Sequence, residues 1–508
     1  MIKNAYLKLL REHEWLPVCL LLALGLALRL YGLGALPRGL NQDEASAGYE
    51  AFALLTGGID RCGNPWPVLL TAWGSGQNAL MTYLAIPFVA PLGLTELAIR
   101  LPNAISGCLT LLVFWRLARR ARGRAFGVTA LALLALNPWH IMMSRWALES
   151  NLLPFFLLLG VRLTVLAKNA RPWALLGAAA AFGLSLYAYG AAFFFLPLYL
   201  IAAAVWLREE IRSNPLPFLV SALLFLLLAF PIALCQLRNT LGLDALRILG
   251  FTLPKLTEGR QTATSVFGGA SAIENFRGFL RILWTQSDGL PWNSLSIWKG
   301  GVFYCFGLPT AAIGFLASLF KRKDHPEETP LRIALLCALV CAFLIRCNIN
   351  RINMIWLPLI YFSALGLHLL LAKLDGWAAL PAAGVLACFL VFLSAYCDAF
   401  GGSGNVNYFP GLGAAIEYAE PAHGGTVYIS GYVNQPYIFA LFYARTPPET
   451  FVSSAVYRDE AAAFRQVERF DGFEFARPEL CGRLILRRGE ADGYTILAEF
   501  GDYLVCSP

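Results

Sequence analysis

The sequence predicts an α-helical polytopic membrane protein of about eleven spans, followed by a small C-terminal α/β domain. Three observations support this fold class. Hydrophobic residues make up 58% of the 508 residues and charged residues only 14%, whereas soluble proteins have about 25% charged residues. Long apolar runs recur along the chain, and clusters of Lys and Arg separate them. After residue 397 this pattern gives way to mixed polar and apolar residues.

Apolar runs of roughly 17–25 residues are long enough to cross a bilayer as helices. The N-terminal run has no small-residue cleavage site, so we expect it to be retained as the first span. The predicted spans lie near residues 15–33, 98–118, 125–142, 151–168, 172–189, 191–207, 216–237, 298–320, 331–347, 352–372 and 376–397.

One further apolar stretch, residues 79–94, is interrupted by Pro87 and Pro91. The orientation of the chain across the membrane decides whether this stretch crosses it. Short loops rich in Lys and Arg stay in the cytoplasm. If residues 79–94 crossed the membrane, the basic cluster 119–124 would fall outside. We therefore expect residues 34–97 to form one large outer loop with two membrane-hugging segments. The basic segments expected inside are Lys3 to Arg11, 119–124, Lys168 with Arg171, Arg208 with Arg212, and Lys321 to Lys323.

With this orientation, residues 398–508 also lie outside. The predicted division is a membrane domain over residues 1–397 and an extracytoplasmic α/β domain over 398–508, in a multi-pass protein of the plasma membrane. Helical and strand patterns alternate in the second domain. They occur at 412–419, 426–429 and 435–444.

The net charge of +8 does not indicate a nucleic-acid partner, because the basic loops beside the spans account for it. Membrane lipid is the expected environment. The 12 cysteines are mostly single residues inside apolar runs, without a CxxC motif or a His/Cys cluster. They are therefore interpreted as small core residues, and no metal site is predicted from them.

Adjacent carboxylates, Asp43 and Glu44, begin the segment after the first span. Apolar residues recur at three- and four-residue steps from Ala45 to Leu55, which predicts a one-sided helix on the membrane surface. The carboxylates would then lie close to a lipid-borne substrate. A second interpretation stays open, because Asn41 is a typical N-cap and acidic residues are favoured in any first helical turn. A divalent cation near the two carboxylates is compatible with both interpretations, although no motif indicates one.

Charged residues at the membrane-embedded ends of spans are costly and are often functional. Arg100 either contributes to a site or reaches to the interface as long side chains do. Arg145 and Glu149 are four residues apart, so they form a helical ion pair or place Glu149 as a second carboxylate facing the first loop. Arg351 opens a span, where it binds a phosphate or lies at the interface.

Polar and aromatic residues also gather in the predicted loop before the eighth span. Asp288, Trp292 and Asn293 are of the kinds that recognise sugars by stacking and hydrogen bonding. Aromatic residues equally form belts at the membrane interface, which leaves the role of Trp292 open. His140 is interpreted as a structural or interfacial histidine.

The sequence resembles the GT-C membrane glycosyltransferases. The residues that carry the resemblance are Asp43-Glu44 after the first span, Arg100-Leu101-Pro102, and Ser144-Arg145 with Glu149. More narrowly, they are similar to the protein O-mannosyltransferase and aminoarabinose-transferase group. The resemblance covers residues 15 to about 170 and continues loosely through 187–189, 286–293 and 350–359.

The resemblance implies that a sugar moves from a polyprenyl-phosphate donor to a protein, lipid or glycan acceptor on the outer face. Asp43 matches the family's first-loop acid, Glu44 is the paired acid beside it, and Glu149 stands where many relatives have Asp. No residue clearly matches the family's phosphate-binding lysine, so Arg61 and Arg351 are the candidates for that role.

The predicted function is therefore an inverting transfer with Asp43 as the general base and with Glu44 and Glu149 as further catalytic candidates. A polytopic transporter or flippase for lipid-linked sugar is the alternative, although such sites lie near mid-membrane between related halves. A non-catalytic glycolipid-binding relative is a third interpretation. The candidates for donor or substrate binding are Arg61, Arg100, Arg145, Arg351, Asp288, Trp292 and Asn293.

Overall fold

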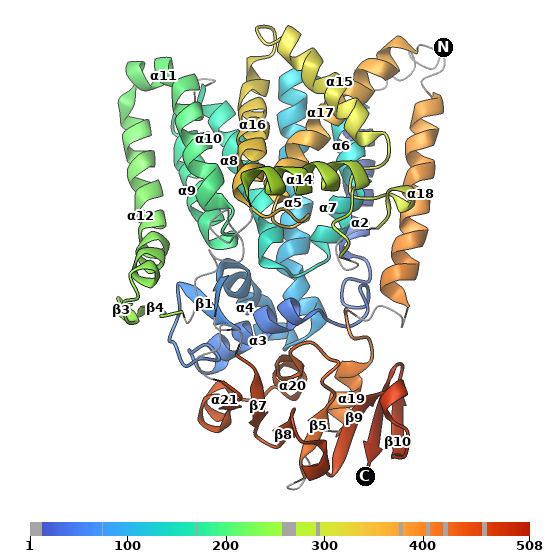
Figure 1. The fold of residues 1–508 in the computed structure, drawn as a ribbon. Helices are drawn as coiled ribbons and strands as arrows, with labels where there is room; N and C mark the ends of the chain where they lie inside the picture. The colour runs from blue at the N-terminus through green and yellow to red at the C-terminus, as the bar shows by residue number, and fades with distance from the viewer. Residues whose placement is uncertain are drawn as a thin grey trace.

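A computed structural model describes most of the chain. Long helices form a bundle, and short elements from residues 34–97 lie beneath it (Figure 1). A sheet with three helices, α19 to α21, forms the end of the molecule opposite the N-terminus. The described residues are 13–73, 75–168, 171–256, 271–290, 295–374, 379–402, 407–419, 425–459 and 465–508.

Helices lie over each apolar run predicted as a span. Among the described residues, five helices are long and apolar enough to cross a membrane, or six if a bent pair is one span. The others are shorter, so the count of about eleven spans stays a prediction. The bundle helices are α2 (Trp15–Leu30), α5 (Glu96–Arg122), α6 (Arg124–Ala135) with α7 (Pro138–Ser144), α8 (Leu153–Lys168), α9 (Ala174–Ala188), α10 (Ala192–Trp206), α12 (Pro215–Thr240), α15 (Gly307–Phe320), α16 (Thr329–Leu344), α17 (Asn353–Lys373) and α18 (Ala379–Gly401).

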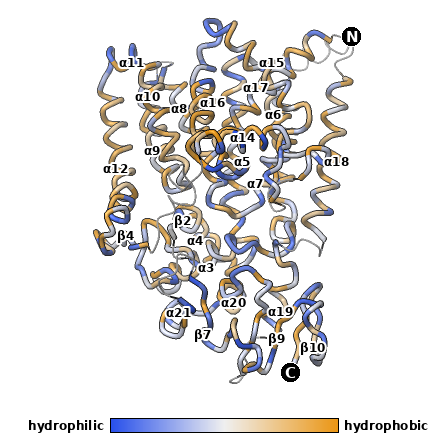
Figure 2. The backbone as a smooth tube through the Cα atoms, in the orientation of Figure 1, coloured by the Kyte–Doolittle hydropathy of each residue, from blue (hydrophilic) through white to orange (hydrophobic). Residues whose placement is uncertain are grey.

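Helices α12 and α18 lie at the edges of the bundle. Only 17% of the apolar window of each is buried, and Figure 2 shows hydrophobic residues along both helices. In a soluble protein such surface would be unfavourable. Its presence is consistent with helices that face lipid.

The break between α6 and α7, bent by 59°, is stabilised by a buried arginine. Arg29 of α2 donates hydrogen bonds to the carbonyls of Leu134 and Ala135, at 3.1 and 3.2 Å. A helix break leaves carbonyls without their usual partners, and an apolar environment makes a substitute donor necessary. Arg29 Nε also donates to Nδ1 of His140 at 3.2 Å, so His140 is a structural histidine.

The loop before α15 contains a helix that the sequence pattern did not predict. Helix α14 (Ala272–Thr285) begins with a capping box formed by Ser271 and Glu274. It crosses the bundle (Figure 1) and packs against α16. The span predicted near residues 298–320 is shorter than expected, because α15 begins only at Gly307.

Basic loops that the sequence assigns to one side meet at one end of the bundle. Arg119 and Arg124 pair with Glu14 before α2, at 2.6 and 3.2 Å. Arg122 pairs with Glu328, which precedes α16. The C-terminal sheet lies at the opposite end (Figure 1).

Residues 34–97 form two helices and a hairpin. Helix α4 (Leu80–Leu92) has 13 residues, a length of about 20 Å against about 30 Å for a hydrocarbon core. It packs on α3 (Gln42–Thr56) beneath the bundle. The antiparallel hairpin joins β1 (Leu69–Ala72) and β2 (Ser75–Asn78). These lengths fit segments that lie on a membrane surface.

The C-terminal part is an α/β structure, as predicted. Its seven strands follow the order β10-β11-β9-β5-β8-β7-β6, and β5 runs parallel to both of its neighbours. Helix α20 packs against α3 and thereby joins this part to the membrane part. The elements are α19 (Leu412–Ala419), β5 (Val427–Ile429), α20 (Pro436–Ala444), α21 (Pro448–Ser454), β6 (Val456–Tyr457), β7 (Val467–Phe470), β8 (Phe473–Glu474), β9 (Arg483–Arg487), β10 (Thr495–Phe500) and β11 (Tyr503–Ser507).

Candidate active site

Four segments that are distant in the sequence come together between the bundle and the C-terminal sheet. They are the start of α3, the β1–β2 hairpin, the 3-10 turn η1 (Glu149–Leu152) and the start of α17. Hydrogen bonds connect each of them to a neighbour in the group. Asp43, Glu44 and Glu149, the carboxylates predicted as catalytic candidates, lie in these segments.

The start of α3 is a capping box. The Asn41 side chain accepts a hydrogen bond from the Asp43 backbone N–H at 2.9 Å, and the Glu44 carboxylate accepts one from the Asn41 backbone N–H at 3.2 Å. The capping interpretation therefore holds for Asn41 and Glu44. The Asp43 carboxylate is not part of the box, and this side chain is partly exposed.

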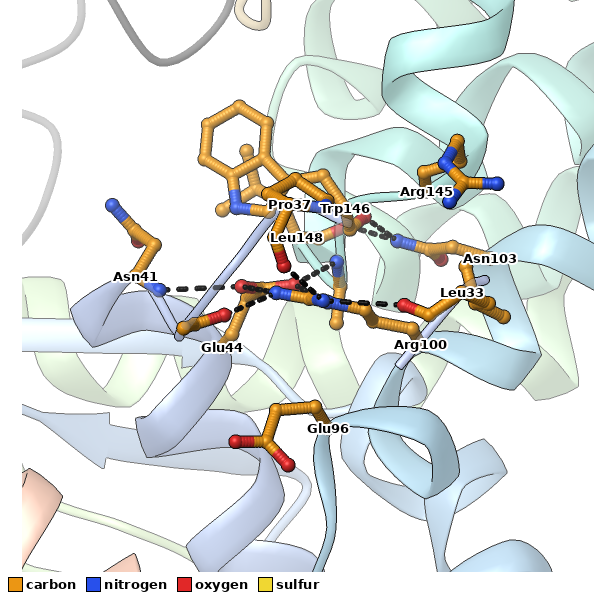
Figure 3. A network of polar contacts seen from close by, with 12 residues as sticks. Leu33, Pro37, Asn41, Glu44, Glu96, Arg100, Asn103, Arg145, Trp146 and Leu148 are labelled. Atoms are coloured by element: carbon orange, nitrogen blue, oxygen red, sulfur yellow. Dashed lines mark hydrogen bonds and ion pairs between the residues drawn. The ribbon is translucent and has the colours of Figure 1, made fainter. Parts of the chain in front are cut away.

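Glu44 also forms a buried ion pair with Arg100 of α5, at 2.8 Å between Oε1 and Nε. Figure 3 shows the Arg100 guanidinium lying against Glu44 and surrounded by backbone oxygens. It donates to the carbonyls of Leu33, Pro37 and Gly39. Both charged side chains are fully buried with their hydrogen bonds satisfied, which favours a role in holding the link between α2 and α3 over contact with substrate.

Arg145, at the end of α7, makes similar contacts. Its side chain is buried, and its two terminal nitrogens donate hydrogen bonds to carbonyls at the end of α2 and in the link from α2 to α3. It does not pair with Glu149 as the four-residue spacing suggested. The geometry favours a structural role here as well. The Arg145 acceptors are the carbonyls of Leu28, Tyr31, Gly32 and Leu36.

Glu149 begins η1 and is held from two sides. Its Oε2 accepts a hydrogen bond from the Asn78 backbone N–H at the end of β2. The Asn103 side chain donates to the carbonyl of Leu148 at 2.9 Å, and Asn353 donates to that of Ser150 at 3.0 Å. A buried carboxylate with fixed flanking backbone is preorganised, as a catalytic or binding group must be.

A cleft of about 330 Å³ adjoins this arrangement. Asn78 lines the cleft, as do Arg351 and the apolar side chains of Phe193, Phe194 and Leu69. The cleft therefore combines a cation and backbone polar groups with apolar walls. Such a lining suits a ligand with an anionic head and a hydrocarbon chain.

Arg351 is anchored beside the cleft. Its backbone N–H donates to Oδ1 of Asn348 at 2.7 Å, and one guanidinium nitrogen donates to the carbonyl of Arg346 at 3.3 Å. A guanidinium has five N–H donors, so this side chain keeps the capacity to bind a phosphate.

Arg61 is placed differently from Arg351. It is buried with Glu50 of α3, at 3.1 Å between Nε and Oε1, and its guanidinium lies 4.7 Å from the Trp73 ring centroid. It does not line the cleft that contains Arg351, which favours a structural role. Burial raises the pKa of Glu50 to about 8, although Arg61 opposes the shift. Burial also raises the pKa of Asp60.

The remaining sequence candidates lie in the loop after α14. Asp288 accepts backbone hydrogen bonds from Leu290 and Ile349, at 3.0 and 2.9 Å, and so ties this loop to the segment before α17. Trp292 and Asn293 lie outside the described residues.

Sequence reasoning missed the amide groups that position Glu149. Asn78 acts through its backbone, so no side-chain signal could have revealed it. Asn103 lies three residues after Arg100 on the same helix. That spacing places both polar side chains on one face of a span, which is the signal that was available.

No group of three or more His, Cys, Asp or Glu side chains able to hold a metal ion occurs within the described residues. The adjacent carboxylates of Asp43 and Glu44 do not form such a group either, because both oxygens of Glu44 accept hydrogen bonds from Arg100.

A helical bundle, a polar site at one end and a terminal sheet beside it (Figure 1) are the features to compare with known proteins. The family model described as dolichyl-phosphate-mannose-protein mannosyltransferase matches residues 77–234. No curated protein matches the sequence.

Solved structures agree with this fold. ArnT from Cupriavidus metallidurans in the apo state is 14% identical with a TM-score of 0.58, over 96% of this chain and 97% of that chain. The same protein bound to undecaprenyl phosphate is 14% identical with a TM-score of 0.56, over the same shares. The archaeal oligosaccharyltransferase AglB from Archaeoglobus fulgidus is 15% identical with a TM-score of 0.51, over 86% of this chain and 64% of that chain.

Proposed function

We propose that this protein is a membrane glycosyltransferase that moves a sugar from a polyprenyl-phosphate donor to an acceptor. The observation that carries the proposal is the cleft beside Glu149. It brings the Arg351 cation and the hairpin residue Asn78 together with apolar walls. The anionic head and the hydrocarbon chain of a lipid phosphate match these two kinds of lining. The solved complexes of ArnT with undecaprenyl phosphate and of AglB with a dolichol-phosphate support this donor class.

In the proposed reaction, Asp43 removes the proton from the acceptor hydroxyl. The acceptor oxygen forms a bond to the anomeric carbon of the sugar. The bond from that carbon to the phosphate oxygen breaks, and the lipid phosphate leaves with the electron pair. Arg351 stabilises the charge on the departing phosphate. Attack opposite the leaving group inverts the anomeric centre.

Glu149 is the second proposed site carboxylate. Its fixed position suits a group that orients the acceptor or the sugar, while the partly exposed Asp43 suits proton exchange with solvent. Because the leaving group is already a phosphate, the reaction requires no nucleotide. The sequence accordingly has no phosphate-binding glycine loop.

The proposed orientation places the basic loops in the cytoplasm. The active site and the C-terminal domain then face the outer side of the plasma membrane. The acceptor is a protein, a lipid or a glycan of that side. Among the described residues, the cleft inside the bundle between α8, α9, α10 and α12 has an almost wholly apolar lining, which does not suit the polar mid-membrane site that the transporter alternative requires.

The test is sugar transfer by the purified full-length protein in nanodiscs. A panel of radiolabelled polyprenyl-phosphate sugars is supplied together with membrane extract as the source of acceptors. We expect one donor to lose its label to an acceptor, and we expect the Glu149→Gln variant to lose this activity. Uptake of labelled lipid across proteoliposomes without any transfer would instead support the transporter alternative.

A further inference from the structure

The β1–β2 hairpin reaches from the C-terminal domain to Glu149. Its register pairs Ala72 with Ser75 at the closed end and Leu69 with Asn78 at the open end. Each strand has four residues, which corresponds to about 13 Å. The two ends of the hairpin therefore contact different parts of the molecule.

The closed end is held by the C-terminal domain. The backbone N–H of Arg465, just before β7, donates to the carbonyl of Trp73 at 3.1 Å. The Trp73 indole also packs edge-on against the Tyr437 ring of α20, with the centroids 5.8 Å apart and the planes at 80°. Trp73 is thus fixed through both its backbone and its side chain.

Arg61 lies beside this pair of rings. Its guanidinium carbon is 4.7 Å from the Trp73 ring centroid and 5.9 Å from that of Tyr437. Among the described residues, its two terminal nitrogens have no hydrogen-bond partner. The Trp73 and Tyr437 rings and the Glu50 side chain are therefore the groups that contact the buried cation. Removing one ring leaves that charge poorly compensated.

The open end meets the candidate active site. The Asn78 N–H donates to the Glu149 carboxylate, and Asn78 also lines the cleft. Beside it, Oε1 of Gln77 accepts a hydrogen bond from Ser46 of α3 at 3.3 Å. A displacement of the hairpin would therefore move a group that contacts Glu149.

We propose that the C-terminal domain is a positioning part of the active site. Arg61, which contacts the packed pair of Trp73 and Tyr437 rings, helps to fix the hairpin so that the Asn78 N–H orients the Glu149 carboxylate. Tyr437 is thus a positioning residue contributed by the C-terminal domain. The catalytic consequence rests on the proposed glycosyltransferase function, whereas the mechanical joint does not.

The test compares three variants of the full-length protein in nanodiscs. Tyr437→Ala removes the ring that packs against Trp73 and Arg61, and Tyr437→Phe retains it. Phe439→Ala is the matched control, because this buried residue of the same helix packs against Phe409. We expect Tyr437→Ala to lower kcat by about 10- to 100-fold, the scale of a misplaced catalytic group. Its KM for the donor should change less than about twofold, since Arg351 is untouched. Tyr437→Phe and Phe439→Ala should keep kcat.

Hydrogen exchange of the hairpin amides supplies a readout that needs no turnover. We expect faster exchange at residues 69–73 and 75–78 in Tyr437→Ala and unchanged exchange in Phe439→Ala. Unchanged hairpin exchange in Tyr437→Ala overturns the proposal, and so does an equal loss of kcat in both alanine variants. If no donor is turned over by the unmodified protein, the proposed function fails, and the exchange data still decide whether the joint exists.

Discussion

Asp43 and Glu44 are adjacent in the chain, yet the fold gives their carboxylates different environments. Glu44 completes the cap of α3 and pairs with Arg100, so its oxygens are occupied by the protein. Asp43 lies on the partly exposed side of the same turn. A general base must reach the acceptor proton, and among these two only Asp43 has a side chain that solvent reaches.

Substitution of Asp43 separates catalysis from capping. Asp43→Asn removes the charge while preserving the size, and the cap is supplied by Asn41. If Asp43 is the base, transfer falls by roughly 10²–10⁴-fold while donor binding and thermal stability change little. The measurements are initial rates, donor binding and melting temperature on the same preparation.

Asn41→Ala is the companion variant, because it removes the cap itself. It should cost about 1 kcal/mol of stability. Full turnover by a well-folded Asp43→Asn protein would exclude Asp43 as the base and make Glu149 the next candidate.

Arg351 is the residue expected to bind the donor phosphate. Charge-assisted hydrogen bonds contribute about 1.5–3 kcal/mol, so Arg351→Ala should weaken binding of polyprenyl phosphate by roughly 10- to 100-fold. Arg351→Lys should weaken it less, because lysine keeps the charge but loses the planar fork. Arg346→Ala is the control, since Arg346 is exposed and does not line the cleft. Equal affinities in all of these proteins would remove Arg351 from the site.

At the scale of elements, helix α3 contacts the bundle with one part and the C-terminal domain with another. Its first turn meets Arg100. Further along, Tyr49 donates to the Thr446 carbonyl at 3.0 Å, and Glu50 contacts Arg61, which lies near the Tyr437 ring of the C-terminal domain. Because both contacts are buried, α3 and the C-terminal domain should unfold as one unit.

Glu50 makes the stability of this unit depend on pH. Burial raises its pKa to about 8 from a reference value of 4.5, so between these values the folded state keeps a proton that the unfolded chain has released. The stabilisation is complete below about pH 4.5 and is lost as the pH rises through about 8. Melting temperatures between pH 6 and 9 should therefore fall more steeply for the unmodified protein than for Glu50→Gln.

The ionisable groups near Glu50 are common to both proteins. They are Asp60, Cys62, Tyr49, Tyr437, Tyr457, Arg61, Arg465 and Glu449. Parallel melting curves for the two proteins would show that Glu50 does not titrate in this window.

At the scale of the whole molecule, the basic loops and the C-terminal sheet lie at opposite ends (Figure 1). The ion pairs of Arg119 and Arg124 with Glu14, and of Arg122 with Glu328, bring the basic segments together. The positive-inside rule then predicts which end faces the cytoplasm.

Reporter fusions test this orientation. A fusion after Arg122 should report the cytoplasm, and a fusion after Pro508 should report the outer side. The same pair of fusions is informative about residues 79–94. If both reporters lie on one side, that stretch crosses the membrane, and the assignment of the active face is wrong.

Local patterns made several features predictable. The length of each apolar run determines where a helix can bury its backbone in lipid, and helices occur over every predicted run. The Asn41 cap is likewise encoded within four residues. Glu149 and Arg351 were candidates from the sequence because charges at the ends of spans are rare, and their roles stay predictions.

By itself, the sequence determined where the apolar helices lie and which charged residues stand at their ends. These properties depend on neighbours within a few turns. Only the tertiary structure decided which groups these charged residues contact. It paired Glu44 with Arg100, placed Arg61 near the Tyr437 ring of the C-terminal domain, and brought the Asn78 backbone N–H to the Glu149 carboxylate. Each of these contacts closes a long loop of chain. A local sequence pattern therefore does not show which charged side chains are paired within the protein and which remain available to a substrate.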